Sequence, residues 1–456
     1  MFEMAVDCFN PKVETMPGTE LRSIEEQKLR RQVSYLYENS MFYRKKFDAA
    51  GLKPDQIKTV DDLRLIPFTT KDELRESQVN YPPLGDYLTV AREKTIRIHS
   101  SSGTTGRPSF VALTHHDRGV WNEMASRAFY ATGVRPHHTV IFALSIGFFV
   151  GGLPSSAAIE NIGATLVPIG TGASERVMAS MENLKADYLA CTPSYANYLA
   201  EFIREKTGRE PASQFGIRGI HVGAEPGGGI PSVRQKIEQD WGAMLCEAMG
   251  NADMAPLIWG ECEAQQGMHF CGQEFIIPEI IDPETGARKE LENGVTGELI
   301  YTAIDRESSA LLRFRTRDHV IAWTEPCSCG RTSMRIRCIG RTDDMLIVLG
   351  VNVFPSAVRD VVSGFTPRTT GEIRILLDEP GPLAKPPLKV VVEAADLENA
   401  GNLKRELEEA IRAKLIVPAK VLLVSPGVMP RSEMKTQLLI KLYEGQPEWL
   451  KNSIVE

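Results

Sequence analysis

Between Glu20 and Ala50, apolar residues recur at mixed spacings of three and four positions among many Arg, Lys and Glu residues. Because an α-helix turns once every 3.6 residues, this spacing places the apolar side chains on one face and predicts a helical segment. Further along, Thr70 precedes Lys-Asp-Glu-Leu, and a threonine before such a run is typical of a helix N-cap. We therefore expect helices in this part of the chain.

Short β-branched or apolar runs alternate with helical patterns through the middle of the chain. The strand candidates are residues 139–144, 167–169, 188–192, 217–222 and 244–248. This alternation predicts βαβ units, in which parallel strands are joined by helices that pack on the sheet.

The pattern changes between Phe275 and Leu349, where strand candidates follow one another closely. Turn sequences separate them, among them Asp282-Pro-Glu-Thr-Gly and Glu292-Asn-Gly. A β-rich subdomain is therefore predicted here.

The residues after Gly350 show a third pattern, with strands at 388–393 and 420–424 and an amphipathic helix at 403–415. These elements predict a small separate α+β domain. The complete chain is thus expected to have an α/β fold, with a large N-terminal domain of parallel sheets and a β-rich subdomain, followed by a small α+β C-terminal domain.

Composition narrows the class of protein. The 456 residues are 43% apolar, which is enough for a large core in two or three domains. The formal net charge of -7 comes without a long run of either sign, which argues against nucleic acid as the main partner. No window approaches the ~20 apolar residues of a membrane span, and acids stand at the N-terminus where a signal peptide needs bases. We therefore expect a cytosolic globular protein without a membrane partner.

A strand candidate at residues 96–100 runs directly into a loop rich in serine, threonine and glycine. Its glycines let the backbone approach a ligand, and its hydroxyls add donors beside the N–H groups, so the loop is suited to hold phosphate. A Walker A motif would need Gly-Lys-Ser/Thr, whereas Arg107-Pro-Ser follows Gly106. An ordinary flexible loop is the alternative. The candidate phosphate-binding residues are Ser100, Ser101, Ser102, Gly103, Thr104, Thr105 and Gly106.

Five further stretches accompany this loop. They are Thr192-Pro-Ser-Tyr195, Gly223-Ala-Glu-Pro226, Leu312-Arg-Phe-Arg-Thr-Arg-Asp318, the run from Gly340 to Pro355, and Pro430-Arg-Ser-Glu-Met-Lys435. On these six motifs the chain resembles the adenylate-forming superfamily of acyl-CoA synthetases, and most closely its phenylacetate–CoA ligase type. The resemblance extends over nearly the whole chain, and six matches in order are hard to obtain by chance.

The resemblance implies a large adenylation domain at residues 1–342 and a small mobile domain at residues 343–456, with a hinge at Asp343 or the adjacent Asp344. It also implies a reaction. ATP would activate an aryl or arylacetic acid to an acyl-adenylate with loss of pyrophosphate, and coenzyme A would then take the acyl group and release AMP. Two other hypotheses stay open, an adenylating enzyme that loads a carrier protein and a catalytically idle relative that binds ligands. Whether the chain forms a homodimer is also left open.

Individual residues take roles from the same resemblance. Lys435 matches the family's catalytic lysine, whose ammonium would contact the α-phosphate during adenylation. Asp318 would accept hydrogen bonds from the ribose hydroxyls, although a turn aspartate paired with Arg315 or Arg317 is the alternative. Arg341 would lie near the ribose and phosphates. The turn of Gly223, Ala224, Glu225 and Pro226 would lie beside the adenine.

An acyl pocket should be largely apolar, with few polar contacts. The run 142–152 and Tyr195 are candidates for its lining, because glycines in the run leave room beside Phe148 and Phe149. The alternative is that these residues are ordinary core. The sequence does not distinguish phenylacetate from benzoate, indoleacetate or a substituted relative.

Two metal sites are also predicted. Asp253 stands where the family usually has a glutamate that helps to hold Mg²⁺, so the ligand would be one methylene shorter. Cys262, His269, Cys327 and Cys329 make a set suited to a structural Zn²⁺, with Cys271 as a competing thiol. The alternative is four unconnected residues. The expected ligands and cofactors are therefore ATP, coenzyme A, Mg²⁺ and a structural Zn²⁺.

Overall fold

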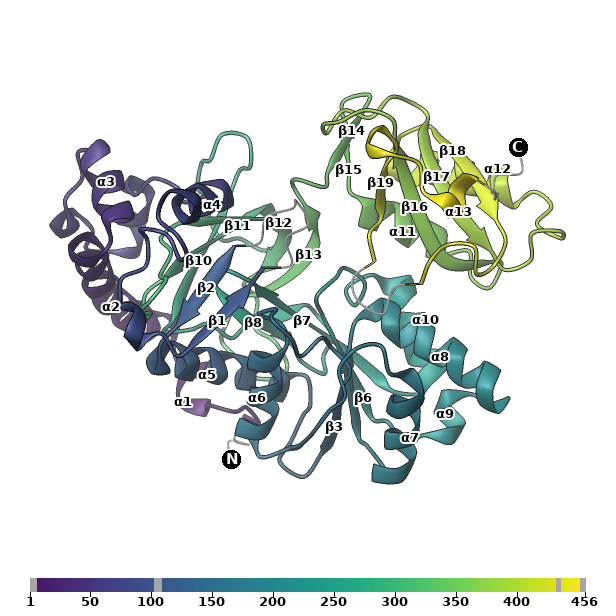
Figure 1. Cartoon of the computed structure of the whole chain (residues 1–456), viewed down its shortest axis with the longest axis horizontal. Coiled ribbons are helices and arrows are strands. Elements are labelled where there is room, and N and C mark those ends of the chain that lie inside the picture. The colour runs from purple at the N-terminus through teal and green to yellow at the C-terminus, as the bar shows by residue number, and fades with distance from the viewer. Residues whose placement is uncertain (1–5, 102–108, 432–435, 452–456) are drawn as a thin grey trace. The chain divides into compact units, whose positions relative to one another are not determined.

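The computed structural model describes residues 6–101, 109–431 and 436–451 (Figure 1). The predictions for Ser102, Gly103, Thr104, Thr105, Gly106 and Lys435 lie outside the described residues. The chain divides into two compact units, of which the first comprises Met1–Cys191, Phe215–Ala224 and Cys246–Arg337. The second comprises Thr192–Gln214, Glu225–Leu245 and Cys338–Glu456. The domain boundary at residues 342 and 343 stays a prediction.

The first unit opens with the expected helices. Helix α1 (Pro11–Glu14) is followed by α2 (Gly18–Asn39) and α3 (Met41–Ala49), so the helical prediction for residues 20–50 is confirmed with one interruption. Ser40 causes it, because its backbone is extended and its hydroxyl accepts a hydrogen bond from the N–H of Tyr43. The predicted cap at Thr70 is confirmed, since its hydroxyl accepts from the N–H of Glu73 at the start of α4 (Lys71–Asn80).

Eleven strands of the described chain form one sheet in the order β10-β11-β12-β13-β9-β8-β7-β6-β5-β3-β4. Strands β4, β3, β5 and β6 pair in parallel, as predicted. Strands β10 to β13 lie in the predicted β-rich region and form antiparallel pairs. Strands β7, β8 and β9 precede that region, and their antiparallel pairing was not predicted; β7 includes residues 244–248, which were predicted as part of the βαβ units. The strands are β3 (Thr139–Phe142), β4 (Thr165–Pro168), β5 (Tyr188–Cys191), β6 (Gly219–Val222), β7 (Met244–Asn251), β8 (Ala255–Glu261), β9 (Met268–Phe270), β10 (Ile276–Ile281), β11 (Val295–Ala303), β12 (Phe314–Trp323) and β13 (Arg335–Arg341).

Helix α5 (His115–Ala131) packs against β8 and α6 (Leu153–Ile162) (Figure 1). The contact is close, because a Cβ on Gly260 of β8 would lie 2.7 Å from the Cα of Ala128. Glycine at this position therefore sets how near the helix comes to the sheet. Helices α6 and α7 (Ser174–Leu184) link parallel strands, which confirms the predicted βαβ units.

The second unit contains a four-stranded sheet in the order β18-β17-β16-β19, with α11 and α12 in the same unit. The predicted strands and helix after residue 388 are confirmed as β17, α12 and β18, whereas β16, β19 and α11 were not foreseen. The elements are β14 (Leu346–Val348), β15 (Val351–Val353), α11 (Pro355–Ser363), β16 (Thr369–Leu377), β17 (Leu388–Ala394), α12 (Leu403–Leu415), β18 (Ala419–Val424), β19 (Leu439–Lys441) and α13 (Glu448–Lys451).

Three helices from earlier in the chain also belong to the second unit. They are α8 (Pro193–Thr207), α9 (Pro211–Gln214) and α10 (Pro231–Trp241). Buried Trp241 joins α10 to α8 by donating its indole N–H to the carbonyl of Ala196 at 3.1 Å. Among the described helices of both units, none is long and apolar enough to cross a membrane.

Candidate active site

Hydrogen bonds join the two ends of the predicted phosphate-binding loop. Strands β1 (Arg97–Ser100) and β2 (Phe110–Leu113) pair antiparallel, which confirms the strand predicted at residues 96–100. Just beyond the pair, the N–H of Ser101 donates to the carbonyl of Ser109 at 3.0 Å. The N–H of Ser109 returns a bond to the Ser101 hydroxyl at 3.1 Å. Both serines are buried, so residues 101 and 109 form a fixed base for the loop.

Asp253 lies beside this base but is already ion-paired. The ammonium of Lys71 contacts both of its carboxylate oxygens, at 2.7 and 2.6 Å, and the Ser109 hydroxyl lies 3.3 Å from one of them. Asp253 is 5% exposed. A carboxylate has about four lone-pair sites, so a cation at Asp253 would share it with Lys71 rather than find it free.

Helix α4 supports the loop base from a second point. The side-chain amide of Gln78 accepts from the N–H of Phe110 at 3.0 Å and donates to its carbonyl at 2.7 Å. The Tyr87 hydroxyl donates to the same carbonyl at 3.1 Å, and burial raises the pKa of Tyr87. Sequence reasoning missed Lys71, Gln78 and Tyr87, because nothing in the local pattern shows which distant strand they reach.

Asp318 lies on β12 and is 7% exposed. Its N–H donates to the Thr316 hydroxyl at 3.0 Å. Arg315, one of its two proposed partners, instead pairs with both oxygens of Glu298, at 3.0 and 2.5 Å. The backbone N–H of Arg317 also reaches Glu298, at 3.3 Å. Glu298, which is fully buried, therefore organises the arginine-rich strand that carries Asp318.

The Gly223–Pro226 turn combines close backbone packing with a buried carboxylate. A Cβ on Gly223 would lie 2.7 Å from the carbonyl oxygen of Ala248, and Ala224 has a φ of 71°. Glu225 is 8% exposed and accepts from the N–H of Ser194 at 2.8 Å. Its other oxygen accepts from the N–H of Thr436 at 2.7 Å. The side chain is thus used for backbone contacts within the second unit.

The hinge candidate Asp343 forms a two-point ion pair with Arg341. The guanidinium donates from Nε to Oδ1 at 2.9 Å and from Nη2 to Oδ2 at 2.8 Å. Both side chains are substantially exposed, at 35% and 53%. Exposed pairs of this kind contribute only about 0–1 kcal/mol, so this ion pair adds little to stability.

The acyl-pocket candidates differ in exposure. Phe148 is 50% exposed, and its ring centre lies 6.0 Å from that of Phe110 in β2. Its carbonyl accepts from the N–H of Ser100 at 3.0 Å. Phe149 is half-buried and forms a β-bridge with Ser100. Tyr195, in the second unit, is fully buried, and its N–H donates to the Thr192 hydroxyl at the start of α8.

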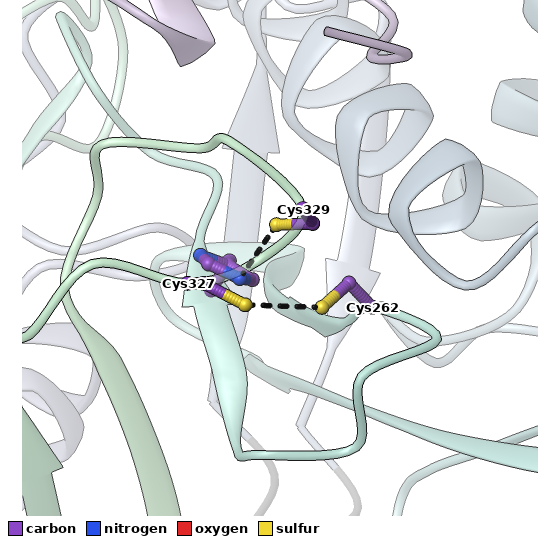
Figure 2. Close-up of side chains that lie close together, drawn as sticks. Cys262, Cys327 and Cys329 are labelled. Atoms are coloured by element: carbon purple, nitrogen blue, oxygen red, sulfur yellow. Dashed lines mark hydrogen bonds between the residues drawn. The ribbon is translucent and has the colours of Figure 1, made fainter.

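The four predicted zinc ligands come together. Figure 2 shows the three cysteines of the set. Cys262 follows β8, His269 lies on β9, and Cys327 and Cys329 lie between β12 and β13. Pairing of Arg335 with His269 across β13 and β9 brings the two sequence segments side by side. The ligand atoms all lie within 4.8 Å of one another. The cluster prediction is therefore confirmed at the level of side-chain geometry.

Two distances between ligand atoms are close to those that a tetrahedral ion requires. The sulfurs of Cys262 and Cys327 are 3.7 Å apart, and the Cys329 sulfur lies 3.3 Å from Nε2 of His269. Zn–S bonds near 2.3 Å and Zn–N bonds near 2.0 Å give tetrahedral edges of about 3.8 and 3.5 Å. Hydrogen bonding from Cys262 and His269 lowers the pKa of the Cys329 thiol. The set therefore fits a soft tetrahedral cation.

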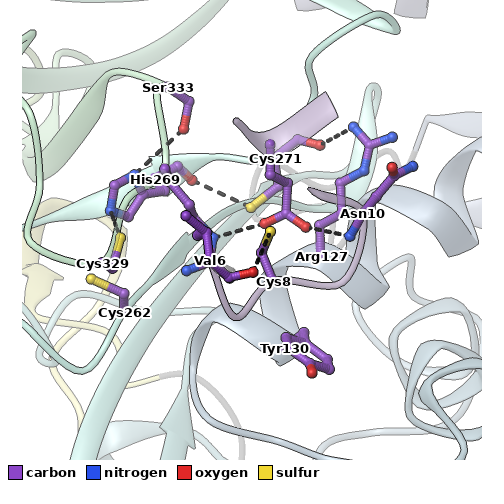
Figure 3. Close-up of polar contacts among 12 residues, drawn as sticks. Val6, Cys8, Asn10, Arg127, Tyr130, Cys262, His269, Cys271, Cys329 and Ser333 are labelled. Atoms are coloured by element: carbon purple, nitrogen blue, oxygen red, sulfur yellow. Dashed lines mark hydrogen bonds and ion pairs between the residues drawn. The ribbon is translucent and has the colours of Figure 1, made fainter. Parts of the chain in front are cut away.

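Residues around the cluster orient the histidine (Figure 3). The Ser333 hydroxyl lies 3.4 Å from Nδ1 of His269, which leaves Nε2 facing Cys329. Cys271 is turned away, with its thiol 3.4 Å from the carbonyl of His269, and burial raises its pKa to about 12. Among the described residues the cluster contains the four predicted side chains without Cys271.

The cluster loop also holds the N-terminal segment of residues 6–16, a contact that sequence reasoning missed. Arg331 and Glu14 form a buried ion pair at 2.7 Å. The N–H of Thr332 donates to the carbonyl of Glu14 at 3.0 Å. Gly330 has a φ of 81°, and a Cβ there would lie 2.6 Å from a methyl carbon of Val6. The loop with Cys327 and Cys329 therefore packs directly on the start of the described chain.

Comparison with known proteins agrees with this arrangement. A model of the AMP-binding enzyme family matches residues 32–303, and a model of the AMP-binding enzyme C-terminal domain matches residues 350–442. A phenylacetate-coenzyme A ligase of Thermus thermophilus is 35% identical over 444 residues, covering 93% of this chain and 97% of its own. A phenylacetate-coenzyme A ligase of Escherichia coli is 33% identical, with coverages of 93% and 95%.

Among solved structures, a 2-hydroxyisobutyryl-CoA ligase in the postadenylation state, in complex with R3-HIB-AMP, is similar to this chain with a TM-score of 0.89. The two are 29% identical, and the match covers 97% of this chain and 95% of the other. The adenylate-forming fold predicted from the sequence is confirmed by this similarity. The chain belongs to the family of AMP-binding enzymes.

Proposed function

We propose that the chain activates an aromatic carboxylic acid with ATP and transfers the acyl group to coenzyme A. The observation that carries the proposal is the similarity to phenylacetate-coenzyme A ligases over nearly the full length of both chains. In the first step a carboxylate oxygen bonds to the α-phosphorus, and pyrophosphate leaves with the electron pair of the broken P–O bond. In the second step the thiol sulfur bonds to the carbonyl carbon, the thiol loses its proton, and AMP leaves.

The described residues support this chemistry. Ser101 and Ser109 hold the base of a loop whose composition is suited to phosphate. Asp318 is the proposed ribose partner, and its carboxylate lies on a strand fixed by Arg315 and Glu298. Lys435 is the proposed source of positive charge at the α-phosphate, where negative charge increases in the transition state.

Asp253 is the proposed protein ligand of Mg²⁺, since its oxygens suit a hard cation and it lies 3.3 Å from Ser109 at the loop base. When bound, Mg²⁺ would neutralise part of the phosphate charge. Lys71 adds a second cation at the same carboxylate. Together these residues would keep positive charge next to the bound triphosphate.

We propose that Cys262, His269, Cys327 and Cys329 hold a structural Zn²⁺. Three thiols and one imidazole within 4.8 Å make a closed set of four ligands, which is typical of structural rather than catalytic zinc. A cation would also relieve the repulsion between neighbouring thiolates. The ion would fasten the β8–β9 and β12–β13 loops to each other and take no part in the acyl transfer.

A panel of acids tests the proposal. Phenylacetate, benzoate and 2-hydroxyisobutyrate would each be incubated with ATP, with and without free coenzyme A. We expect phenylacetate or benzoate to give acid-dependent pyrophosphate release, and AMP release that depends on coenzyme A. Activity with 2-hydroxyisobutyrate alone would contradict the aromatic assignment. Adenylation without AMP release to free coenzyme A would favour a carrier protein as acceptor.

Two further predictions stay untested, a cytosolic location and a homodimer. Analytical ultracentrifugation of the purified protein would measure its mass in solution and so test whether it is a dimer.

A further inference from the structure

Strand β12 departs from regular pairing with its neighbour β11 just before His319 (Figure 1). Between the pairs Glu298–His319 and Ile300–Arg315, β11 advances by two positions and β12 by four. Residues 316–318 therefore lie opposite a single residue of β11 and form a β-bulge. Bulges bend a strand locally and change the direction in which a side chain points, and they are frequent next to active sites.

Arg317, in the middle of the bulge, has an unusual backbone conformation. Its φ is 66°, which lies in the left-handed region that residues other than glycine seldom adopt. Such a conformation persists only where the surrounding structure holds it in place. The bulge therefore requires partners that fix it.

Glu298 of β11 is the first of these partners. Its Oε1 accepts from the backbone N–H of Arg317 at 3.3 Å and from Nε of Arg315 at 3.0 Å. Its Oε2 accepts from Nη2 of Arg315 at 2.5 Å. The Glu298 side chain is fully buried, so these bonds form away from water. Glutamine at this position would offer one accepting oxygen for the three N–H donors and would turn an NH₂ group towards a donor.

Thr316 is the second partner. Its hydroxyl donates to the carbonyl of Leu299 at 2.8 Å and accepts from the N–H of Asp318 at 3.0 Å. Thr316 is buried. In a regular antiparallel pair, backbone groups of the two strands would bond to each other. Here the threonine hydroxyl joins the backbone of Asp318 to β11 instead.

We propose that Glu298 and Thr316 are positioning residues for the ribose of ATP, because they hold the bulge to which Asp318 belongs. The proposal rests on the proposed function, in which Asp318 accepts hydrogen bonds from the ribose hydroxyls. Two hydrogen bonds to one carboxylate require a fixed orientation, since such bonds weaken steeply as their angles fall. Loss of the bulge contacts should therefore weaken recognition of the two hydroxyls more than binding of the rest of the nucleotide.

The test compares binding of ATP with binding of 2′,3′-dideoxy-ATP, which lacks both ribose hydroxyls, by isothermal titration calorimetry. Because hydrogen bonds to a charged oxygen are strong, the wild type should bind ATP about 10- to 100-fold more tightly. Asp318→Ala removes the proposed ribose partner and should bind the two nucleotides within about threefold of each other. Glu298→Gln and Thr316→Val should each lower the wild-type preference for ATP at least about fivefold.

Two control variants separate positioning from general damage. Thr316→Ser keeps the hydroxyl and should keep the wild-type preference for ATP. Glu279→Gln changes another fully buried carboxylate of the same sheet, which pairs with Arg313 outside the bulge at 3.2 Å. This variant should also keep the wild-type preference. The threonine variants decide the question even where Glu298→Gln does not fold, because they leave the buried charges unchanged.

A wild-type preference in Glu298→Gln or in Thr316→Val would overturn the proposal for that residue. An equal loss of affinity for both nucleotides would also overturn it, because the damage would then be general. These results would leave the ribose role of Asp318 standing if Asp318→Ala still loses the preference. Equal binding of both nucleotides by the wild type would instead refute that role in the proposed function, and this proposal with it.

Discussion

The ion pair between Glu14 and Arg331 leads to a sharp prediction about the N-terminal segment. The two side chains are 2% and 4% exposed, and the guanidinium Nε donates to the carboxylate at 2.7 Å. The second oxygen of Glu14 accepts from the N–H of Asn10, also at 2.7 Å. The pair therefore connects the loop after Cys329 to residues 6–16, and Glu14→Gln would remove the negative charge while keeping the shape.

The expected effect is large because the guanidinium stays buried. Removing one partner of a buried pair typically costs about 3–5 kcal/mol, since the other charge is left uncompensated. Other contacts hold the segment at separate points, among them the ion pair of Asp7 with Arg135 at 2.8 Å and the bond from Gln273 to the carbonyl of Val13 at 3.1 Å. Because residues 6–16 lie near the start of the chain, the loss should appear as local opening of this segment rather than as global unfolding.

Hydrogen exchange followed by mass spectrometry would measure this opening, and trypsin cleavage at exposed Lys12 would report it independently. Glu26→Gln is the matched control, because Glu26 pairs with Arg22 on the surface of α2, where such a pair is worth only about 0.3–0.5 kcal/mol. Arg331→Met combined with Glu14→Gln should recover part of the loss, since no charge is then left buried. An effect in Glu14→Gln as small as that in Glu26→Gln would refute the reasoning.

Three further predictions concern catalysis, metal and pH. Lys435→Ala should abolish acid-dependent pyrophosphate release while ATP binding persists, and near-wild-type adenylation would contradict its role. Wild-type protein purified without a nickel column should contain about one zinc per chain. The Cys327→Ser variant should lose this zinc and should be less stable. Wild-type protein without zinc would contradict the proposed site. Burial lowers the pKa of His221 to about 3, below its usual 6.5. Between these two pH values the histidine is protonated in the unfolded chain but not in the folded one. The free energy of unfolding should therefore fall as the pH drops from about 6.5 towards 3. His221 should contribute up to about 1.4 kcal/mol per pH unit, and an unchanged acid slope in urea titrations of His221→Leu would contradict this.

The sequence pattern predicted those helices and strands that are determined by residues close together in the chain. The cap at Thr70 and the parallel strands β3 to β6 follow from residues close together in sequence. The interruption between α2 and α3 at Ser40 was not predicted, because the helical pattern is strong on both sides and a single capping residue changes it little. Strand β16 was missed as well.

Contacts of the candidate site between residues far apart in the sequence could not be predicted from local patterns either. Ligand chemistry identified Cys262 and Cys329, but the register of β13 on β9 is what brings their segments together. Lys71 was read only as part of a helix start, whereas its ammonium reaches Asp253, 182 positions away. The bond from Thr436 to Glu225 likewise depends on tertiary folding, which no spacing along the chain reveals.

The proposed reaction is tested most directly by following all products with phenylacetate as the acid. With ATP, Mg²⁺ and coenzyme A present, we predict that AMP, pyrophosphate and phenylacetyl-CoA form in equal amounts. Omitting coenzyme A should leave pyrophosphate exchange but stop turnover. Failure of phenylacetate, and of every other carboxylic acid in the panel, to yield AMP with intact protein would contradict the proposed function.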